Sequence, residues 1–542
     1  MKPIFHKIAA MLCAVASLCT FTACESLDTA PEDYFSSGNF WKDATQAKGY
    51  MYGLNYYLRS TYSTQFFMGE MRGGALGDGD DGTGVSVYGE ALSNQDYIKQ
   101  NLTADKAYFT NWNGLYTQVM QINHALDNIE SATYLTDSQK ALYKAQAYGM
   151  RAYYYFLLYR TWGGVPLVLD VQILNGKITA ERLYKARATA AEIMAQIKTD
   201  IDASETYYNA TSETVNPGVY QWGKHATLML KADIYTWAAK VSTGNYTATG
   251  TADLQTARTA LLEIVNSGKY SLRSNFADLF NPLLKSSDTE MILALPYNTT
   301  DKVYQPLAAN LLAQQAFFAN CYDINGNKFT LNDSVFGTRI YINGIVRYMY
   351  KESFWRTFDE ADTRRDATFL NVYASANGTK TGSDFGLLLR KYAGRYDSSE
   401  GTHYLDTDGT IYRYAEVLLL LAEVENALGN ATATYINQIR ERAYGSNYPV
   451  YTEGTQAENE LAILAERDKE FVFEGKRWFD VLRMRDASGR ALVFSSDANY
   501  PFIAGTTITP ILDYTTEAYK VLWPIATATL TIDPELTQTD GY

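Results

Sequence analysis

The chain has 542 residues, 46% of them apolar, and a formal net charge of −13 at pH 7. This acidic balance argues against nucleic acid or anionic lipid as a partner, because both are bound through basic patches. Tyrosine is the compositional outlier, with 44 residues against 23 phenylalanines and 8 tryptophans. Its ring and hydroxyl suit both helix packing and contacts with sugars, and the count alone does not choose between these uses.

The first residues have the layout of a bacterial secretion signal. Lys2 and Lys7 form a short basic region, and an apolar, charge-free stretch follows over 8–23. This stretch is too short and too poorly flanked for a spanning helix. Small residues directly before Cys24 are typical of a lipobox, so we predict that residues 1–23 are removed and that Cys24 is acylated and anchors the chain to a membrane. An ordinary signal peptide followed by a coincidental cysteine is the alternative.

Cysteine usage indicates a fold without disulfides. Cys13 and Cys19 leave with the signal, and the lipid on Cys24 leaves Cys321 without a disulfide partner. An exported protein of this size is then stabilised by its hydrophobic core alone. We expect Cys321 to be a small buried residue of that core.

Helical signals dominate the first half and the last third of the chain. Thr136 and Gln139 form a capping box, and the apolar residues that follow recur every three or four positions until Gly163. The same periodicity predicts further helices, over 111–129, 189–201, 224–240, 252–266, 413–428 and 458–485. A partner helix begins at about Asn430, directly after Gly429, which predicts an antiparallel helical hairpin.

Several such hairpins predict a mainly α fold with a tetratricopeptide-like scaffold, although the strict repeat signature of that class is absent. Between about 296 and 410, Gly, Asn and Asp punctuate short apolar runs, which indicates an irregular, partly β insertion. Binding residues usually lie on loops of this kind. No linker separates the parts, so we predict one domain over 24–542.

An acidic glycine-rich segment at 77–82 matches the pattern G-x-G-x-x-G but does not suit a dinucleotide. Its aspartates would repel a pyrophosphate, and neither a strand before it nor a helix after it is predicted. It does not fit an EF-hand, because Gly82 stands where a third ligand belongs. A simpler calcium site or a contact with sugar hydroxyls remains open, and a solvated acidic loop is the alternative.

Zinc and nucleophile motifs are absent from the sequence, whereas a carboxylate pair for glycoside hydrolysis, which is defined by separation in space, stays open in principle. The histidines that remain after cleavage lack the spacing of a zinc site, and no nucleophile elbow G-x-S-x-G occurs; these histidines are His124, His225 and His403. Carboxylates on the predicted helices have cationic neighbours at helical spacing: Glu474 with Arg477, and Asp480 with Arg477 and Arg483. Ion pairing lowers a carboxyl pKa and suits a structural role. We therefore predict a protein that is not an enzyme and needs no cofactor, a structural calcium ion aside.

Several segments resemble the SusD/RagB family of outer-membrane nutrient-binding lipoproteins. The most specific is 466–483; the others are 151–156 with 163–167, 411–423, 435–443 and 522–542. Asp533 and Thr539 stand where the family usually has asparagine. The charged residues of these segments are interpreted as scaffold ion pairs, and they are Arg413, Glu416, Glu423, Glu470, Glu474, Arg477 and Asp480.

The resemblance implies a fold of about four tetratricopeptide-like helical pairs with a variable insertion. It implies a lipid-anchored protein at the cell surface, in the outer membrane, that acts as the hinged lid of a TonB-dependent, SusC-like transporter. Such a lid binds oligosaccharides and delivers them to the barrel without covalent chemistry. A peptide-binding lid of the RagB type, and a scaffold that holds a protein partner without a nutrient, remain open.

Ligand contacts vary within this family, so the resemblance gives only segments, here 72–97 and about 301–404. Aromatic faces stack on sugar rings, and carboxylates accept hydrogen bonds from sugar hydroxyls. We therefore predict ligand contacts in these segments, at Asp78, Asp80, Asp81, Tyr88, Tyr322 and Trp355. Packing or plain solvation is the alternative for each of them.

Overall fold

The computed structural model describes residues 40–77, 91–171, 183–310, 312, 319–329, 345–501 and 507–542. The signal and Cys24 lie outside these ranges, as do the four predicted contacts Asp78, Asp80, Asp81 and Tyr88. Within the described ranges, no helix combines the length and the apolar character that a membrane span requires.

Helices are the predominant secondary structure of the described residues, as predicted. Those of the N-terminal half are α2 (Ala44–Tyr57), α3 (Tyr62–Glu70), α4 (Gln95–Ile98), α5 (Asn113–Ser131), α6 (Asp137–Trp162), α7 (Ala190–Ala210), α8 (Lys224–Lys240) and α9 (Thr251–Asn266). The later ones are α11 (Glu352–Trp355), α12 (Thr363–Thr368), α13 (Tyr414–Ala427), α14 (Ala433–Tyr444), α15 (Gln456–Glu470), α16 (Arg477–Arg483) and α17 (Thr527–Ile532).

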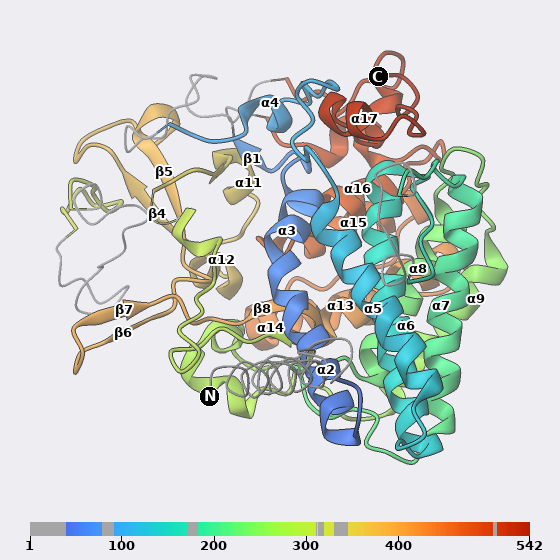
Figure 1. Ribbon diagram of the computed structural model, residues 1–542. Coiled ribbons are helices and arrows are strands. Elements are labelled where there is room, and N and C mark those ends of the chain that lie inside the picture. Colours follow the sequence, from blue (N-terminus) through green and yellow to red (C-terminus); the bar gives the residue numbers. More distant parts are fainter. Residues whose placement is uncertain are drawn as a thin grey trace, which may run out of the picture.

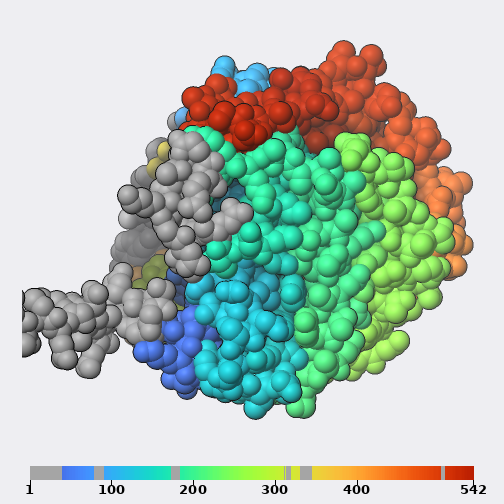
Figure 2. Space-filling model, turned by 45° about the vertical axis from the view of Figure 1, so that its right-hand side comes forward, coloured from blue at the N-terminus to red at the C-terminus, as the bar shows by residue number. Residues whose placement is uncertain are grey.

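Consecutive long helices pack side by side. Helices α5 to α9 follow one another in space, α9 packs on α13, and α13 contacts α14 and α15 (Figure 1). This series is the predicted tetratricopeptide-like scaffold. Figure 2 shows α6 to α9 from the side, with the C-terminal segment 507–542 lying across their upper ends.

Helix α6 is the centre of this scaffold, and its ends follow the predicted signals. The N–H of Gln139 donates to Oγ1 of Thr136, and the N–H of Thr136 donates to Oε1 of Gln139, both at 3.1 Å. Gly163, at a φ of 73°, ends the helix. The C-terminal half of α6 is buried on every face, including Tyr154 and Tyr155. Many tyrosines of this chain therefore serve helix packing.

The described strands form four antiparallel pairs. These are β1 (Leu76–Gly77) with β3 (Met349–Tyr350), β2 (Met291–Leu295) with β8 (Gly409–Arg413), β4 (Phe369–Tyr373) with β5 (Phe385–Leu389), and β6 (Arg395–Asp397) with β7 (Thr402–Tyr404). The ladder of β2 and β8 closes the base of the insertion, because β2 ends where the insertion begins and β8 begins where it ends. Strands β4 to β7 project from this base on the side away from α7 to α9 (Figure 1).

The single helix predicted over 458–485 is wrong, because the chain breaks between α15 and α16. Phe473 and Gly475 take positive φ values of 62° and 69° in this break. Helix α3 passes so close to it that a Cβ on Gly69 would lie 1.7 Å from the carbonyl oxygen of Gly475. The helical periodicity continues through the break, and only the backbone contact with α3 requires the turn.

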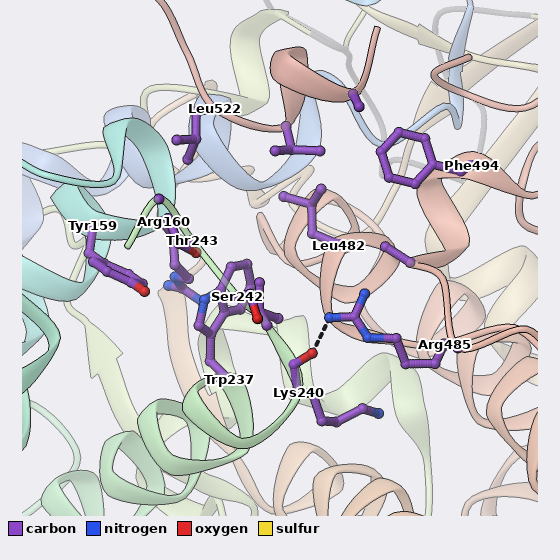
Figure 3. Close-up of a pocket in the computed structure, with 16 residues that line it drawn as sticks. Tyr159, Arg160, Trp237, Lys240, Ser242, Thr243, Leu482, Arg485, Phe494 and Leu522 are labelled. Atoms are coloured by element: carbon purple, nitrogen blue, oxygen red, sulfur yellow. Dashed lines mark hydrogen bonds between the residues drawn. The ribbon is translucent and has the colours of Figure 1, made fainter. Parts of the chain in front are cut away.

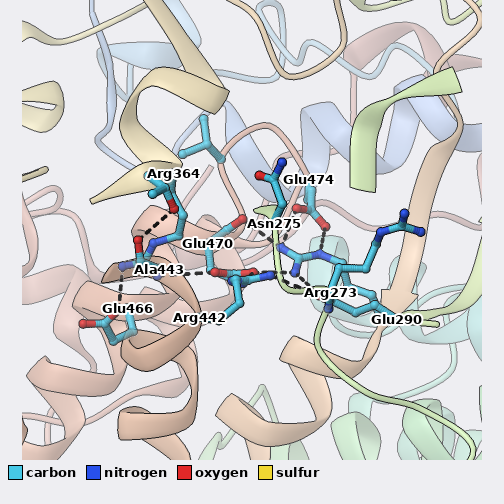
Figure 4. A network of polar contacts seen from close by, with 12 residues as sticks. Arg273, Asn275, Glu290, Arg364, Arg442, Ala443, Glu466, Glu470 and Glu474 are labelled. Carbon is cyan, nitrogen blue, oxygen red and sulfur yellow. Dashed lines mark hydrogen bonds and ion pairs between the residues drawn. The ribbon is translucent and has the colours of Figure 1, made fainter. Parts of the chain in front are cut away.

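A buried ion-pair network joins the break to the rest of the scaffold (Figure 4). The guanidinium of Arg413 lies 2.8 Å from Glu290, 2.6 Å from Glu470 and 2.9 Å from Glu474. All four side chains are fully buried or nearly so. Burial opposes ionisation of Glu470, but the guanidiniums of Arg442, Arg413 and Arg364 outweigh it and hold its pKa below the usual value.

The insertion is tied to the same network. Arg364, at the start of α12, lies 2.9 Å from Glu466 and 3.3 Å from Glu470. Lys391, which follows β5, donates to a carboxylate oxygen of Glu474. Charged groups from the insertion and from α15 therefore neutralise one another inside the core, which fixes the insertion on the scaffold.

The charged residues predicted to form scaffold ion pairs do so, but some partners differ from the prediction. Asp480 pairs with Arg483 at 2.9 Å as expected, and with Arg467 at 2.8 Å in place of Arg477. Arg477 pairs with Asp468 of α15, and Glu474 pairs with Arg413 and Lys391. The helical spacing assumed one continuous helix, whereas the break turns Arg477 back toward α15.

The two glutamates of α13 form the predicted kind of ion pair as well. Glu416 lies 3.0 Å from Lys476, and Glu423 lies 2.8 Å from Arg483.

A cavity of about 400 Å³ lies where the C-terminal segment meets the ends of α6 and α8 (Figure 3). Its walls come from α6, α8, the turn at 241–244, α16 and the segments 485–494 and 518–522. Cys321 belongs to the main hydrophobic core and is 4% exposed, as expected.

Candidate ligand-binding site

The two segments expected to bind ligand meet at residues 347–350, which end with strand β3. Leu76 and Gly77 of β1 pair with Tyr350 and Met349 of β3. On the far side of residues 78–90, the N–H of Ser93 donates to the carbonyl of Arg347 at 2.8 Å. The Arg347 guanidinium in turn donates to the carbonyl of Ala91 at 2.9 Å. The residues on both sides of the acidic segment 78–90 are therefore held by one short stretch of the insertion, residues 347–350.

An aromatic cluster supports this junction beneath α4. Phe67 lies 5.2 Å from Tyr108 and 5.6 Å from Tyr348, and Tyr97 lies 5.0 Å from Tyr108, between ring centroids. Asn94, in the left-handed region at φ 58°, donates from its side-chain amide to the hydroxyl of Tyr348. Burial raises the pKa of Tyr348 to about 12, so this hydroxyl stays protonated. The cluster gives the site a rigid base.

A cavity of about 220 Å³ opens beside the junction. Its walls come from β1, α4, the start of α11, Asn499 and residues 509–511, and its polar side chains include Lys99, Gln100, Lys351 and Asn499. Ammonium and amide groups of this kind donate hydrogen bonds to hydroxyl and carboxylate oxygens. Asn499 and residues 509–511 were not among the predicted ligand segments, because only the fold brings them here.

Tyr322 and Trp355 are the predicted contacts that the structure describes, and both adjoin the β4–β5 pair. The Trp355 ring is half-buried, 5.3 Å from the ring of Phe385, with the guanidinium of Arg365 5.6 Å from its centroid. Tyr322 is half-buried and exchanges two backbone hydrogen bonds of 2.9 Å with Tyr373. Their contact with a ligand stays a prediction.

Comparison with known proteins gives this architecture a family. Residues 266–542 match the family model described as "SusD family", and residues 77–236 match the one described as "Starch-binding associating with outer membrane". The chain belongs to the SusD family. The resemblance to SusD and RagB proteins noted in the helical segments is thereby confirmed.

Several solved and curated SusD proteins are similar over nearly the whole chain. A SusD superfamily protein of Bacteroides fragilis NCTC 9343 is 34% identical, with a TM-score of 0.81 over 93% of this chain and 100% of that one. B. fragilis NanU is 31% identical, with a TM-score of 0.77 over 95% and 99%. SusD-like protein P38 of Formosa agariphila is 26% identical over 89% of this chain and 92% of that protein. Surface glycan-binding protein A of Bacteroides fluxus, 23% identical over 92% and 98% of the two chains, shares the fold with a TM-score of 0.65.

Arg72, at the start of one predicted ligand segment, is a structural anchor in this SusD protein. It is fully buried, and its guanidinium lies 4.2 Å from the ring of Trp478 and 5.1 Å from that of Trp523. Its Nε donates to the side-chain carbonyl of Gln100 at 2.7 Å. Burial lowers the pKa of Arg72 to about 10. The residue ties the chain before β1 to α4 and to the C-terminal motif, and sequence patterns gave no signal of this.

The described histidines lie in structural settings. His225 is buried, and its Nδ1 lies 3.0 Å from the hydroxyl of Tyr270. Burial lowers the pKa of both His225 and His403 to about 4, so both are neutral near pH 7. Over the part of the chain that the structure describes, no group of three or more His, Cys, Asp or Glu side chains could hold a metal ion. The aspartates at 78–81 lie outside that part.

Glu70, at the end of α3, lies directly beneath the junction of β1 and β3. It is buried, and the Tyr350 hydroxyl donates to its Oε1 at 2.8 Å, while its Oε2 has no hydrogen-bond partner among the described residues. Burial raises its pKa from 4.5 to about 7. The folded protein thus favours the protonated carboxyl, and this contribution to stability is full below pH 4.5 and is lost as the pH rises through 7.

Glu70→Gln is therefore expected to make the protein less sensitive to alkaline pH. Relative to the variant, the wild type should lose about 3 kcal/mol of unfolding free energy between pH 4.5 and pH 8, since one pKa unit is about 1.4 kcal/mol. Denaturant unfolding at the two pH values measures this difference. The exposed Glu213→Gln serves as the control and should leave it unchanged. Parallel pH dependence of the wild type and Glu70→Gln would contradict the prediction.

Proposed function

We propose that this protein binds oligosaccharides at the cell surface and delivers them to a TonB-dependent, SusC-like transporter, as its hinged lid. The observation that carries the proposal is the junction at 347–350, where β3 and Arg347 just before it hold the residues on both sides of the acidic segment 78–90. Membership in the SusD family and the starch-binding description of the matched family support the choice of sugar as the ligand class. Capture and release require no catalytic group.

The chemistry of the junction suits an uncharged sugar chain. Trp355 offers a half-buried aromatic face, and the cavity beside β1 is lined by the polar side chains of Asn499, Gln100 and Lys351. Each of these three also donates to a backbone carbonyl, which fixes its position. Sugars present both apolar ring faces and hydroxyls, so they use both kinds of group. The aspartates at 78–81 add carboxylate acceptors to the proposed site, from a segment outside the described residues.

Trp355→Ala is expected to weaken oligosaccharide binding about tenfold, which corresponds to roughly 1.4 kcal/mol. A panel of plant and host oligosaccharides, screened by calorimetry, first identifies the ligand, and the variant is then titrated with it. Tyr514→Ala, at an exposed tyrosine of the C-terminal segment, is the control and should bind as the wild type does. Wild-type binding of peptides and of no sugar would contradict this proposal and favour a lid of the RagB type.

The anchor of the lid in this proposal is the lipid on Cys24, which lies outside the described residues. A lipid-tethered lid can open and close while it remains at its transporter. Cys24→Ala is expected to release the protein from the outer membrane with its fold intact. Membrane fractionation after a high-salt wash measures this, and retention of the variant in the membrane fraction would show that another feature holds it there.

A further inference from the structure

The cavity at the ends of α6 and α8 lies apart from the candidate ligand-binding site. It shares no lining residue with the cavity beside β1. At about 400 Å³ it falls in the size range of small-molecule sites, which is roughly 300–1,000 Å³. Nothing in the proposed capture of oligosaccharides uses it.

The lining of this cavity is electropositive, although the whole chain carries a net charge of −13. Arg160, Lys240 and Arg485 contribute to its walls, and no Asp or Glu does. Carboxylates behind the wall compensate two of these cations: Lys240 lies 2.7 Å from Glu423 and 2.8 Å from Glu460, and Arg160 lies 3.2 Å from Asp233.

Arg485 is the lining cation without an ion pair of its own, although the more distant carboxylates of Glu460, Glu423 and Asp486 favour its charged form. Its guanidinium donates to the backbone carbonyl of Lys240 and forms no ion pair with a described carboxylate within 4.0 Å, while its backbone N–H donates to Glu460 at 3.2 Å. The side chain is half-buried, and burial lowers its pKa below the usual value. Because the guanidinium is already partly desolvated, binding a carboxylate through two hydrogen bonds costs it little additional desolvation free energy.

Two further donors line the cavity without partners. Nε of Arg160 and the indole N–H of Trp237 have no hydrogen-bond partner among the described residues, although the side chains are only 8% and 2% exposed. Buried donors left unpaired in this way destabilise a fold, and their presence in one cavity wall points to a ligand acceptor. Figure 3 shows Arg160 at the left of the cavity, Trp237 and Lys240 in the lower centre, and Arg485 at the right.

The opposite wall is apolar. Leu482, Phe494 and Leu522 lie along it (Figure 3). An inorganic anion would leave this wall uncovered, whereas an apolar body that carries an anionic group covers it. Because Glu423 and Glu460 lie behind the wall, a ligand with one negative charge is repelled less than a phosphate of charge about −1.5 to −2, which favours a carboxylate.

We propose that this cavity is a second binding site, which takes a carboxylate attached to an apolar group. The carboxylate pairs with Arg485, and the apolar group lies against Leu482, Phe494 and Leu522. A free organic acid and the C-terminal carboxylate of a peptide share this chemistry.

The test uses the full-length protein and three probes: N-acetyl-phenylalanine, its amide, and N-acetyl-Gly-Gly-Phe with a free carboxylate. Calorimetry is expected to show binding of the acid at least tenfold tighter than binding of the amide. Tighter binding of the tripeptide than of the single acid identifies a peptide terminus as the ligand, and the reverse order identifies a small acid.

Arg485→Gln should abolish the preference for acid over amide. Arg390→Gln, at an exposed arginine after β5, is the matched control and should keep it. Ala518→Trp, at an exposed lining position, should block both acid and amide without touching the charge, which keeps the test valid if Arg485→Gln unfolds. Equal affinities for acid and amide, no binding of any probe at millimolar concentration, or wild-type binding by Ala518→Trp would overturn the proposal.

Discussion

Replacing Gly69 by alanine is expected to destabilise the protein by roughly 3 kcal/mol or more, because overpacking displaces backbone at this site. The new Cβ would lie 1.7 Å from the carbonyl oxygen and 2.4 Å from the carbonyl carbon of Gly475. Neither atom belongs to a flexible side chain that could move aside. Helix α3 would have to separate from the break between α15 and α16, and the contact of Phe66 with Phe473, 4.2 Å between ring centroids, would open.

Gly49→Ala is the matched control for this prediction. Gly49 also lies within a helix, α2, and a Cβ there would meet nothing within 4 Å. Alanine in an open helical position is favoured over glycine by about 1 kcal/mol, so this variant should be slightly more stable than the wild type. Thermal and denaturant unfolding measure both variants. Equal stability of Gly69→Ala and Gly49→Ala would contradict the close approach of α3 to the break.

Arg413→Met is expected to destabilise the protein by about 3–5 kcal/mol, the usual effect of leaving buried charges without their partner. The variant keeps the apolar stem but leaves Glu290, Glu470 and Glu474 with fewer positive neighbours in the core. Arg413→Lys should recover little, because a single ammonium cannot reproduce the guanidinium contacts with three carboxylates and with the backbone carbonyl of Glu470.

An exposed ion pair provides the comparison for Arg413. Lys106 lies 2.9 Å from Asp96, and both side chains are about half exposed. Lys106→Met should change the unfolding free energy by less than about 1 kcal/mol. Chemical denaturation compares the two variants on the same scale. A loss for Arg413→Met no larger than that for Lys106→Met would show that the network does not hold the insertion on the scaffold.

The helical scaffold followed from local patterns. The helix predicted over 224–240 coincides with α8, and the capping box at Thr136 and the stop at Gly163 bound α6 as expected. These features depend on residues three or four positions apart, so the sequence carries them directly. The insertion was predicted from turn residues, and its approximate limits agree with the ladder of β2 and β8.

The candidate site was only partly predictable. The expected ligand segments do meet at 347–350, but the part played by Asn499 and its neighbours has no local signal, because that segment lies far along the chain from both. Arg72 stood at the edge of a predicted ligand segment and proved to be buried between Trp478 and Trp523. The chemistry of a side chain is read from sequence, whereas its exposure depends on what packs over it.

The sequence by itself determined the export signal pattern, the helical class and the family resemblance, since each depends on residue type at short spacing. The tertiary structure decided the break after α15, the partners of Arg477 and Asp480, and the placement of Arg485 in a cavity. Each of these depends on a contact between segments that are distant in the chain, such as Gly69 against Gly475. Helical periodicity runs unchanged through Phe473 and Gly475, so only the approach of α3 reveals that the backbone must turn there.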